Sequence, residues 1–394
     1  MKYNFDEIID RRGTDSLKWD EMSMFGTQTA ELLPMWIADM DFRTPPFVIE
    51  ALKKRLEHEV LGYTKSCESW SRSVRNWCRT RYGWNFGEDK LVFIPGIVRG
   101  LAAAVRCLTS RGDKVMITSP VYHPFSLVTQ NTGRTLVSCP LQEVNNRYEI
   151  DFNAFEKAVQ GCKIFILCNP HNPGGRVWSR EELRKIADLC AAAGTVVVSD
   201  EIHADLTLPP RKHCTFNTVS ETARLNSIVF MAPSKTFNMA GLASSFGVVE
   251  NDELRRRFFS YLEAGELSHG HMFAYIGAAA AYSHGTEWLD EMLAYIQTNI
   301  DFTEEFLSSR LPRLKMMRPE ASFLIWLDCR AYNLSQEELV ALFVDKARLA
   351  LNNGEMFGNE GRGFMRLNIG CPRSVLKEAL ERLEQAFLSI ESKE

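Results

Sequence analysis

The sequence predicts an α/β protein built on a mainly parallel β-sheet that helices cover on both faces. Short apolar runs alternate along the chain with segments of helical period. These runs lack the polar alternation of half-exposed strands, so we expect strands buried on both faces. Polar residues follow several runs directly, and open α/β sheets bind their ligands at the carboxyl ends of strands.

The apolar runs define the strands of this sheet, and helices lie between them. The expected strands are Leu91–Ile94, Lys114–Thr118, Lys163–Cys168, Thr195–Ser199, Ser227–Met231 and Ser244–Val249. Helices are expected over about 98–110, 124–131 and from Ser179 to near Gly194. The last of these opens with Ser179-x-x-Glu182, a capping box in which each side chain caps a free backbone N–H.

The two ends of the chain predict a second, smaller α+β unit. Residues 1–45 have no regular period. After them, a helix starts at Thr44-Pro45-Pro46 and ends in the turn Leu61–Thr64. A second helix covers about 67–82, and both helices belong to the large domain. Its apolar face carries Trp70, Val74, Trp77 and Cys78. The C-terminal part predicts a long helix (285–311), strands Phe323–Leu327 and Phe364–Ile369, a helix opened by Ser335-x-x-Glu338 and a last helix from Pro372. We therefore expect a large domain over 46–285 and a small domain formed by 1–45 and 286–394.

Composition narrows the function classes. A net charge of −4 argues against a nucleic-acid partner, and the basic run Arg255–Arg257 is interpreted as a solvated helix face. No apolar stretch is long enough to span a bilayer, and the N-terminus has no apolar signal-peptide core. The ten cysteines form no CxxC pair, so we expect reduced thiols in a cytoplasmic protein, with no disulfide framework and no metal site.

Lys235 is the residue around which a site is predicted. It follows the strand Ser227–Met231 in the segment Met231-Ala232-Pro233-Ser234-Lys235-Thr236. A charged amine costs free energy to bury, unless it is a covalent anchor kept neutral or masked as a Schiff base. From this segment alone, an exposed lysine in a turn is an equally open interpretation.

Three more polar residues follow apolar strands. Asp200 directly follows Thr195–Ser199 and would need a cationic partner such as a protonated pyridine nitrogen, or else would cap the next helix. His203 could bond a ring oxygen or lie on a loop. Asn172, in the rigid turn Asn169–Gly175, could donate to a phenolate oxygen.

Two further segments could hold a flat, phosphorylated ligand. In Ile94-Pro95-Gly96-Ile97-Val98, the glycine precedes a helix whose free N–H groups can bind phosphate, although a plain turn is the alternative. Tyr122, in Ser119-Pro120-Val121-Tyr122-His123, offers a ring that could stack on a cofactor or simply pack.

Together these segments resemble the fold-type-I pyridoxal 5′-phosphate (PLP) enzymes of the aminotransferase class I/II superfamily. The segments Asn172-Pro173-Gly174, Asp200-Glu201-x-His203 and Ser234-Lys235-Thr236-Phe237-Asn238 occur in the family's order, and Asp200 follows Asn172 by 28 residues. Trp36-Ile37-Ala38-Asp39-Met40-Asp41-Phe42 and Gly62-Tyr63-Thr64 are similar to the cystathionine β-lyase/C–S lyase subgroup, including cystalysin-type cysteine desulfhydrases. The resemblance covers nearly the whole chain and implies a mainly parallel seven-stranded sheet in the large domain.

The resemblance also implies roles for individual residues. Lys235 would hold the cofactor as a Schiff base and act in catalysis together with Asp200, which would hold the pyridinium proton. Asn172 and His203 would contact the ring oxygen, and Tyr122 would stack on the ring. The amides of Ile97 and Val98, with Ser234, would hold the phosphate, and catalytic Tyr63 would reach it from the second subunit of a homodimer with shared active sites. Arg366 would clamp the substrate carboxylate, and Ala38 and Asn172 would also bind the substrate.

One position departs from the typical aminotransferase pattern. Those enzymes carry a phosphate-binding arginine eight positions after the lysine, and this chain has Ala243 there. His123 stands where cystalysin-like sequences can show a second tyrosine, which leaves the preferred substrate open.

The sequence therefore predicts a PLP-dependent C–S β-lyase acting on a small amino acid, namely cystathionine, cysteine or a related S-substituted cysteine. The alternatives are an aminotransferase, against which Ala243 argues, and a PLP-fold protein with a regulatory binding role. A complete set of Lys235, Asp200, Asn172 and Arg366 argues against a purely non-catalytic protein.

Overall fold

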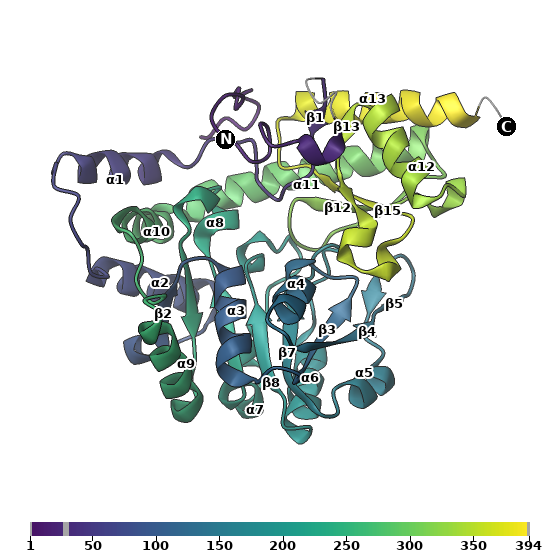
Figure 1. Cartoon of the computed structure of the whole chain (residues 1–394). Helices are drawn as coiled ribbons and strands as arrows, with labels where there is room; N and C mark the ends of the chain where they lie inside the picture. The colour runs from purple at the N-terminus through teal and green to yellow at the C-terminus, as the bar shows by residue number, and fades with distance from the viewer. Residues whose placement is uncertain (1, 27–30, 392–394) are drawn as a thin grey trace.

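The large sheet contains seven strands in the order β2-β10-β9-β8-β7-β3-β4. The computed structural model describes residues 2–26 and 31–391, and Figure 1 shows this sheet in the lower half of the molecule. The strands are β2 (Leu91–Ile94), β3 (Lys114–Ser119), β4 (Thr135–Pro140), β7 (Cys162–Cys168), β8 (Val196–Asp200), β9 (Ser227–Met231) and β10 (Ser245–Val248). Only β10 runs antiparallel to its neighbours β2 and β9, while the other pairs are parallel. The predicted α/β fold with a mainly parallel sheet is confirmed.

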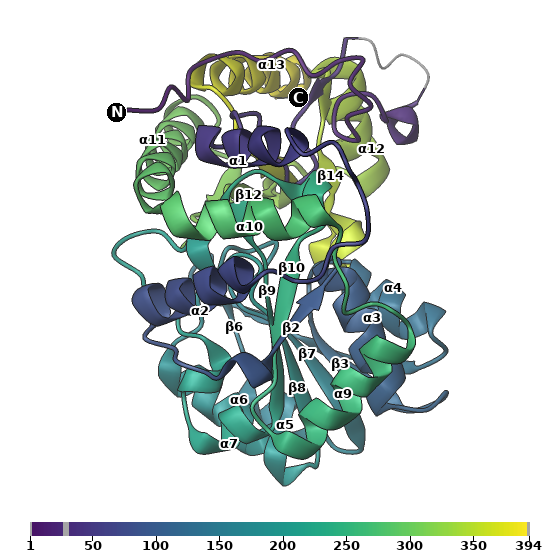
Figure 2. The ribbon, with the colours of Figure 1, turned by 90° about the vertical axis from the view of Figure 1, so that its left-hand side faces the viewer.

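Helices cover both faces of this sheet because its strands are apolar on both sides. Every residue of β2, β9 and β10 is buried. One face packs on α3 (Ile97–Leu108), α4 (Pro124–Asn131) and α9 (Asp252–Ala264). The other packs on α2 (Glu68–Tyr82), α5 (Phe152–Ala158), α6 (Arg180–Ala192), α7 (Glu221–Leu225) and α10 (Met272–His284). Figure 2 shows the two helical layers on either side of the strands.

A smaller antiparallel sheet lies above the large one (Figure 1). Its strand order is β11-β12-β15-β14, with β11 (Lys315–Met317), β12 (Leu324–Asp328), β14 (Asn352–Asn353) and β15 (Phe364–Asn368). The helices α11 (Thr286–Arg310), α12 (Gln336–Ala341) and α13 (Arg373–Glu391) accompany it. From the N-terminal arm, β1 (Leu33–Pro34) pairs in parallel with β13 (Leu349–Ala350). The arm thus joins the C-terminal unit, although the domain boundaries themselves stay a prediction.

The structure differs from the sequence-based expectation at three places. The first helix, α1 (Pro46–Leu56), ends before the Leu61–Thr64 turn, and the chain then runs without regular structure to α2. The seventh strand, β4, has only Cys139 buried, and its other residues are exposed or half-exposed because it is an edge strand, so it lacks a continuous apolar run. Helix α10 packs against both α1 and α2, and its alanine-rich sequence shows no distinct apolar face.

A buried ion-pair cluster ties the N-terminal arm to the segment that follows β1. The Asp41 carboxylate accepts hydrogen bonds from Lys18 Nζ (2.7 Å), Trp19 Nε1 (2.9 Å) and Arg11 Nη1 (3.0 Å). The Lys18 side chain is fully buried, and that of Asp41 is 6% exposed. Because a buried charge is costly without its partner, the cluster fixes where residues 35–42 cross the molecule.

We predict that Asp41→Asn loosens the arm. The change leaves the Lys18 ammonium buried without a counter-ion, and breaking such a pair costs about 3–5 kcal/mol. Hydrogen exchange should therefore accelerate in residues 2–26, and the melting temperature should fall.

The matched control is Asp10→Asn, which removes an exposed ion pair to Arg12 in the same arm (3.7 Å). Such pairs contribute about 0–1 kcal/mol, so exchange should change little. Equal effects of the two variants would show that burial of the cluster is not what holds the arm.

Candidate functional site

Lys235 lies on the one-turn helix α8 (Pro233–Thr236), immediately after β9. Its half-buried side chain lines a pocket of about 1270 Å³, and Nζ donates a hydrogen bond to the Ala38 carbonyl oxygen at 2.5 Å. Burial lowers the pKa of the amine, and the charge of Arg366 adds to this, while Asp39 and Asp200 act in the opposite direction. The lysine is thus placed as a reactive amine and not as a solvated one.

Asp200 ends β8 and is buried, and within the described part of the chain its side chain accepts a single hydrogen bond, from the Ile202 N–H (3.0 Å). Burial raises the pKa of its carboxyl to about 7, opposed by that N–H and by Lys235 and reinforced by Glu201. A carboxylate so poorly provided with donors is costly unless a ligand supplies a cationic one. The interpretation of Asp200 as a helix cap fails, because its bond goes only to the turn that follows it.

His203 is buried a few residues beyond Asp200, and its Nδ1 has no hydrogen-bond partner among the described residues. Burial lowers the pKa of the ring to about 3, and the positive charges of Lys235 and Arg366 add to this effect. The imidazole is therefore neutral at physiological pH and can bond a ligand without carrying charge.

Arg366 is buried within β15, where its guanidinium donates to Asn172 Oδ1 (2.9 Å), Asn352 Oδ1 (2.6 Å) and the Trp36 carbonyl (3.2 Å). Burial lowers its pKa to about 10. No carboxylate among the described residues pairs with it, and its Nε has no partner. A buried guanidinium of this kind is complementary to the carboxylate of a ligand, so the alternative of a surface salt bridge is wrong.

Tyr122 lies between these groups and the large sheet. Its backbone N–H donates to the Asn172 carbonyl (3.0 Å), and its half-buried side chain lines the same pocket as Lys235. Burial raises the pKa of its phenol, and the charges of Arg366 and Asp200 also act on it. The ring is thus available to a flat ligand in the pocket that Lys235 lines.

The start of α3 provides unpaired backbone donors. Gly96 precedes it with φ of 114°, and no side chain caps the helix at Ile97 or Val98. The sheet register places Ser245 of β10 beside Ile94, and Phe246 beside Met231. Because β10 runs antiparallel to both neighbours, the carboxyl ends of β2 and β9 lie on either side of its first residues. The Ile97 and Val98 amides, which follow β2, therefore lie at the same edge of the sheet as buried Ser234, which follows β9. This arrangement suits an anionic group.

Tyr63 is the one predicted site residue that the chain does not bring to its own site. It is fully exposed on the segment between α1 and α2, and this segment projects from the body of the molecule in Figure 1. A role for Tyr63 therefore requires a second chain.

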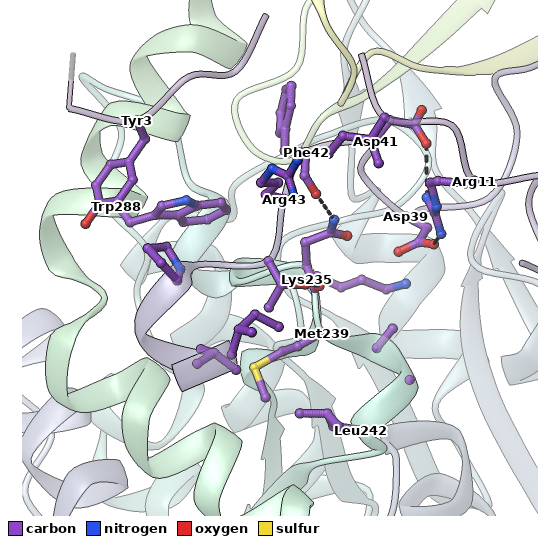
Figure 3. A pocket seen from close by; sticks show the side chains of 18 of the residues that line it. Tyr3, Arg11, Asp39, Asp41, Phe42, Arg43, Lys235, Met239, Leu242 and Trp288 are labelled. Atoms are coloured by element: carbon purple, nitrogen blue, oxygen red, sulfur yellow. Dashed lines mark hydrogen bonds and ion pairs between the residues drawn. The ribbon is translucent and has the colours of Figure 1, made fainter. Parts of the chain in front are cut away.

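The structure adds residues that the sequence did not predict for the site. Asn352 bonds Arg366, and the Phe357 ring lies 4.8 Å from the guanidinium carbon. Arg11 and Asp39 form an ion pair in the wall of the Lys235 pocket, and Figure 3 shows the Lys235 side chain extending toward them. The only sequence signal was the acidic end of the apolar run Leu33–Phe42.

Comparison with known proteins places the chain in a family. The model of the family described as aminotransferase class I and II matches residues 31–383. Cystathionine beta-lyase PatB of Bacillus subtilis is 44% identical over 387 residues, which cover 98% of this chain and 100% of PatB. Cystalysin of Treponema denticola, solved with a pyridoxal 5′-phosphate cofactor, is 36% identical with a TM-score of 0.96, and 99% of this chain and 100% of cystalysin are covered. A PLP-bound C–S lyase of Staphylococcus hominis is 33% identical with a TM-score of 0.90, at 98% coverage of both chains.

Two further features, a metal site and a membrane-spanning helix, are absent from the described residues. No group of three or more His, Cys, Asp or Glu side chains within 2–26 and 31–391 could hold a metal ion. None of the helices in these ranges is long and apolar enough to cross a membrane.

We predict that Asp200→Asn stabilises the ligand-free protein at high pH. The carboxyl ionises near pH 3.8 in the unfolded chain and near 7 in the folded one, so ionisation opposes folding increasingly between these values and fully above 7. The uncharged asparagine avoids this cost, which is at most about 4 kcal/mol. The stability difference between variant and wild type should therefore grow from pH 5 to pH 8 in urea unfolding.

Asp188→Asn, an exposed carboxylate on α6, serves as the control and should show no such growth. A difference between Asp200→Asn and wild type that is the same at both pH values would contradict the raised pKa.

Proposed function

Because the chain belongs to the aminotransferase class I and II family, we propose that it is a PLP-dependent carbon–sulfur β-lyase. It cleaves cystathionine, cysteine or an S-substituted cysteine to a thiol or sulfide, pyruvate and ammonia. The observation that carries the proposal is the similarity to PatB along the whole chain, combined with half-buried Lys235 and buried Asp200 and Arg366. The similarity to cystalysin and to a C–S lyase supports the same reaction class.

The donors and acceptors left without partners support PLP as the cofactor. Among residues 2–26 and 31–391, the buried Asp200 carboxylate has no cationic partner and the buried His203 Nδ1 has no partner at all. The α3 amides of Ile97 and Val98 are uncapped. A pyridinium N–H, a phenolate oxygen and a phosphate would satisfy these groups in turn. We propose that Asp200, His203 with Asn172, and the α3 amides with Ser234 bind these three parts, with Tyr122 against the ring.

The reaction divides between the cofactor and this chain. PLP, when bound, supplies a ring that takes up the electron pair left on the substrate Cα. We propose that Lys235 would hold the cofactor through Nζ and that the same Nζ, once free and unprotonated, would accept the Cα proton of the substrate. Burial, which lowers the pKa of the amine, favours the unprotonated form that this step requires.

The remaining residues orient the substrate and control protons. The Asp200 carboxylate keeps a proton at the pyridine nitrogen. The Arg366 guanidinium binds the α-carboxylate of the substrate, which fixes the Cα–H bond relative to Lys235. Asn172 and Asn352 hold that guanidinium in place, and the Ala38 carbonyl lies next to the Lys235 amine. The C–S bond would then break, and the thiolate would leave Cβ with the bonding electron pair. Hydrolysis of the remaining three-carbon unit by one water molecule would give pyruvate and ammonia.

The rival function with the same cofactor is transamination. Ala243, at the position where typical aminotransferases carry a phosphate-binding arginine, follows the short helix η5 (Ala240–Leu242) with φ of 46°. A methyl group there cannot donate to a phosphate, which favours the lyase. A regulatory binding role in addition to catalysis stays open.

We predict that the purified protein with PLP releases pyruvate from cystathionine, and pyruvate with sulfide from cysteine, without an added keto acid. Lys235→Ala should abolish both reactions, because the base and the covalent anchor are lost together. Borohydride should fix the cofactor to wild type and not to this variant. A strict requirement for a keto acid would establish an aminotransferase instead, and borohydride labelling of another lysine would overturn the role of Lys235.

We further propose a homodimer with shared active sites. Tyr63 projects from the chain on the α1–α2 segment, which also exposes Leu56, Val60 and Leu61. An apolar group on a projecting segment suits burial against a second copy. Tyr63 would then complete the phosphate site of the neighbouring subunit.

We predict that Tyr63→Phe and Lys235→Ala are each nearly inactive but regain activity when refolded together. In a mixed dimer, a tyrosine acting in trans leaves one site with both defects and one site wholly wild type. No recovery on mixing would contradict the shared site. An active Tyr63→Phe would show that the ring only packs.

A further inference from the structure

The wall of the Lys235 pocket carries an ion pair that the proposed chemistry does not use. Arg11 Nη2 lies 2.6 Å from Asp39 Oδ2, and the two side chains are 24% and 23% exposed. Both residues line the pocket together with Lys235. Figure 3 shows them beside the end of the lysine side chain, on the side away from Trp288 and Tyr3.

The pair is held from behind by the buried cluster of the N-terminal arm. Arg11 Nη1 donates to Asp41 Oδ1 (3.0 Å) and to the Met40 carbonyl (3.1 Å). Asp41 is in turn bound by the buried Lys18. The guanidinium is therefore fixed before any ligand arrives, and a fixed group loses little entropy on binding.

The pair still offers a free hydrogen-bond acceptor on Asp39 next to free N–H donors on Arg11. Asp39 Oδ1, Arg11 Nε–H and the second Nη2–H of Arg11 have no partner among the described residues, whose bonds to the pair involve other atoms. A carboxylate oxygen binds an ammonium group, and a guanidinium edge binds a carboxylate. The wall thus presents complementary groups for both charges of an amino-acid zwitterion.

The pair is near enough to the reacting amine for one substrate molecule to reach both. Asp39 is the charged group with the strongest electrostatic effect on Lys235, ahead of Asp200 and Arg366. Arg366 is the buried cation proposed for the α-carboxylate, and it bonds the Trp36 carbonyl at the start of the segment that carries Asp39. A substrate held by Arg366 at one end would thus extend past Lys235 toward Arg11 and Asp39.

We infer that Arg11 and Asp39 form a subsite for the distal amino-acid group of a zwitterionic thioether such as L-cystathionine. The inference rests on the proposed lyase function and specifies its substrate class. Asp39 binds the distal ammonium and Arg11 the distal carboxylate. A cysteine derivative without these charges is cleaved without help from the subsite.

A second ion pair in the same pocket provides a matched control. Arg43 Nε donates to Glu7 Oε2 at 2.6 Å, and these side chains are 66% and 36% exposed. Neither residue is among the charges that act on Lys235. Arg43→Gln therefore removes a pocket charge outside the proposed subsite.

The experiment compares kcat/KM for L-cystathionine with that for S-propyl-L-cysteine, which has the same carbon chain without the distal charges. For Asp39→Asn, an isosteric change, the ratio of the two values should fall at least about tenfold, the order expected for one hydrogen bond between charged groups. The loss should appear mainly in KM, because the distal group is remote from the bonds that change. Arg43→Gln should leave the ratio unchanged.

Two half-charged substrates separate the roles of the pair. Asp39→Asn should weaken cleavage of S-(3-aminopropyl)-L-cysteine and improve that of S-(3-carboxypropyl)-L-cysteine, because the variant loses an attraction in one case and a repulsion in the other. Arg11→Gln should give the opposite pattern. Hydrogen exchange in residues 2–26 shows whether either variant has loosened the arm.

The outcomes distinguish the subsite from the function on which it rests. If wild type releases pyruvate from neither thioether, the lyase proposal itself fails. If wild type cleaves both but Asp39→Asn lowers both equally, the ion pair only holds the backbone and the subsite is refuted. A fall of the ratio in Arg43→Gln instead would move distal recognition to the Glu7–Arg43 pair.

Discussion

The burial of three charged groups without mutual neutralisation is the constraint on which the rest of the structure depends. Lys235, Asp200 and Arg366 come from the ends of β9 and β8 and from the middle of β15, and the last two are almost completely buried. Burial disfavours the charged form of each group, so it lowers the pKa values of Lys235 and Arg366 and raises that of Asp200. Such an arrangement persists only because two apolar sheets hold these residues in place, and the ligand then supplies the missing partners.

The segment Met35–Phe42 connects the two sheets at this point. Asn368, at the end of β15, donates to the Ile37 and Asp39 carbonyls, and Asn238, shortly after Lys235, donates to the Met40 and Phe42 carbonyls. Arg366, which would bind the substrate carboxylate, and Lys235, which would remove the Cα proton, thus lie near side chains that bond the same stretch of backbone. A change in the small sheet would therefore displace Arg366 relative to Lys235 only together with this segment.

The parts of the fold and the site that could be predicted from the sequence are those that depend on a local pattern of neighbouring residues. The β2 and β9 strands have the predicted boundaries, and both predicted capping boxes are present, because apolar runs and caps involve neighbouring residues. Lys235 and Asp200 were identifiable since a charged residue directly after an apolar strand needs a reason. The Arg11–Asp39 pair and the Asn352–Arg366 bond were not, because they join irregular or very short segments that carry no period. Edge strand β4 was missed for a related reason, since half-exposed residues interrupt its apolar run.

The division between buried and exposed charge in the pocket bears on how specificity can vary. Under the proposed function each buried group would meet a particular part of the cofactor or the α-carboxylate, so substitution there would remove the chemistry. Arg11 and Asp39 are about a quarter exposed and are held by an arm cluster whose other members, Lys18 and Asp41, are buried. Substitution at this outer pair can change which thioether is bound while the buried groups keep their positions. Ala243 is a comparable position, because the absence of an arginine there alters the charge around the phosphate without altering the sheet. The positions of Arg11, Asp39 and Ala243 would thus determine substrate choice and reaction type. The buried charges would determine only whether PLP chemistry occurs at all.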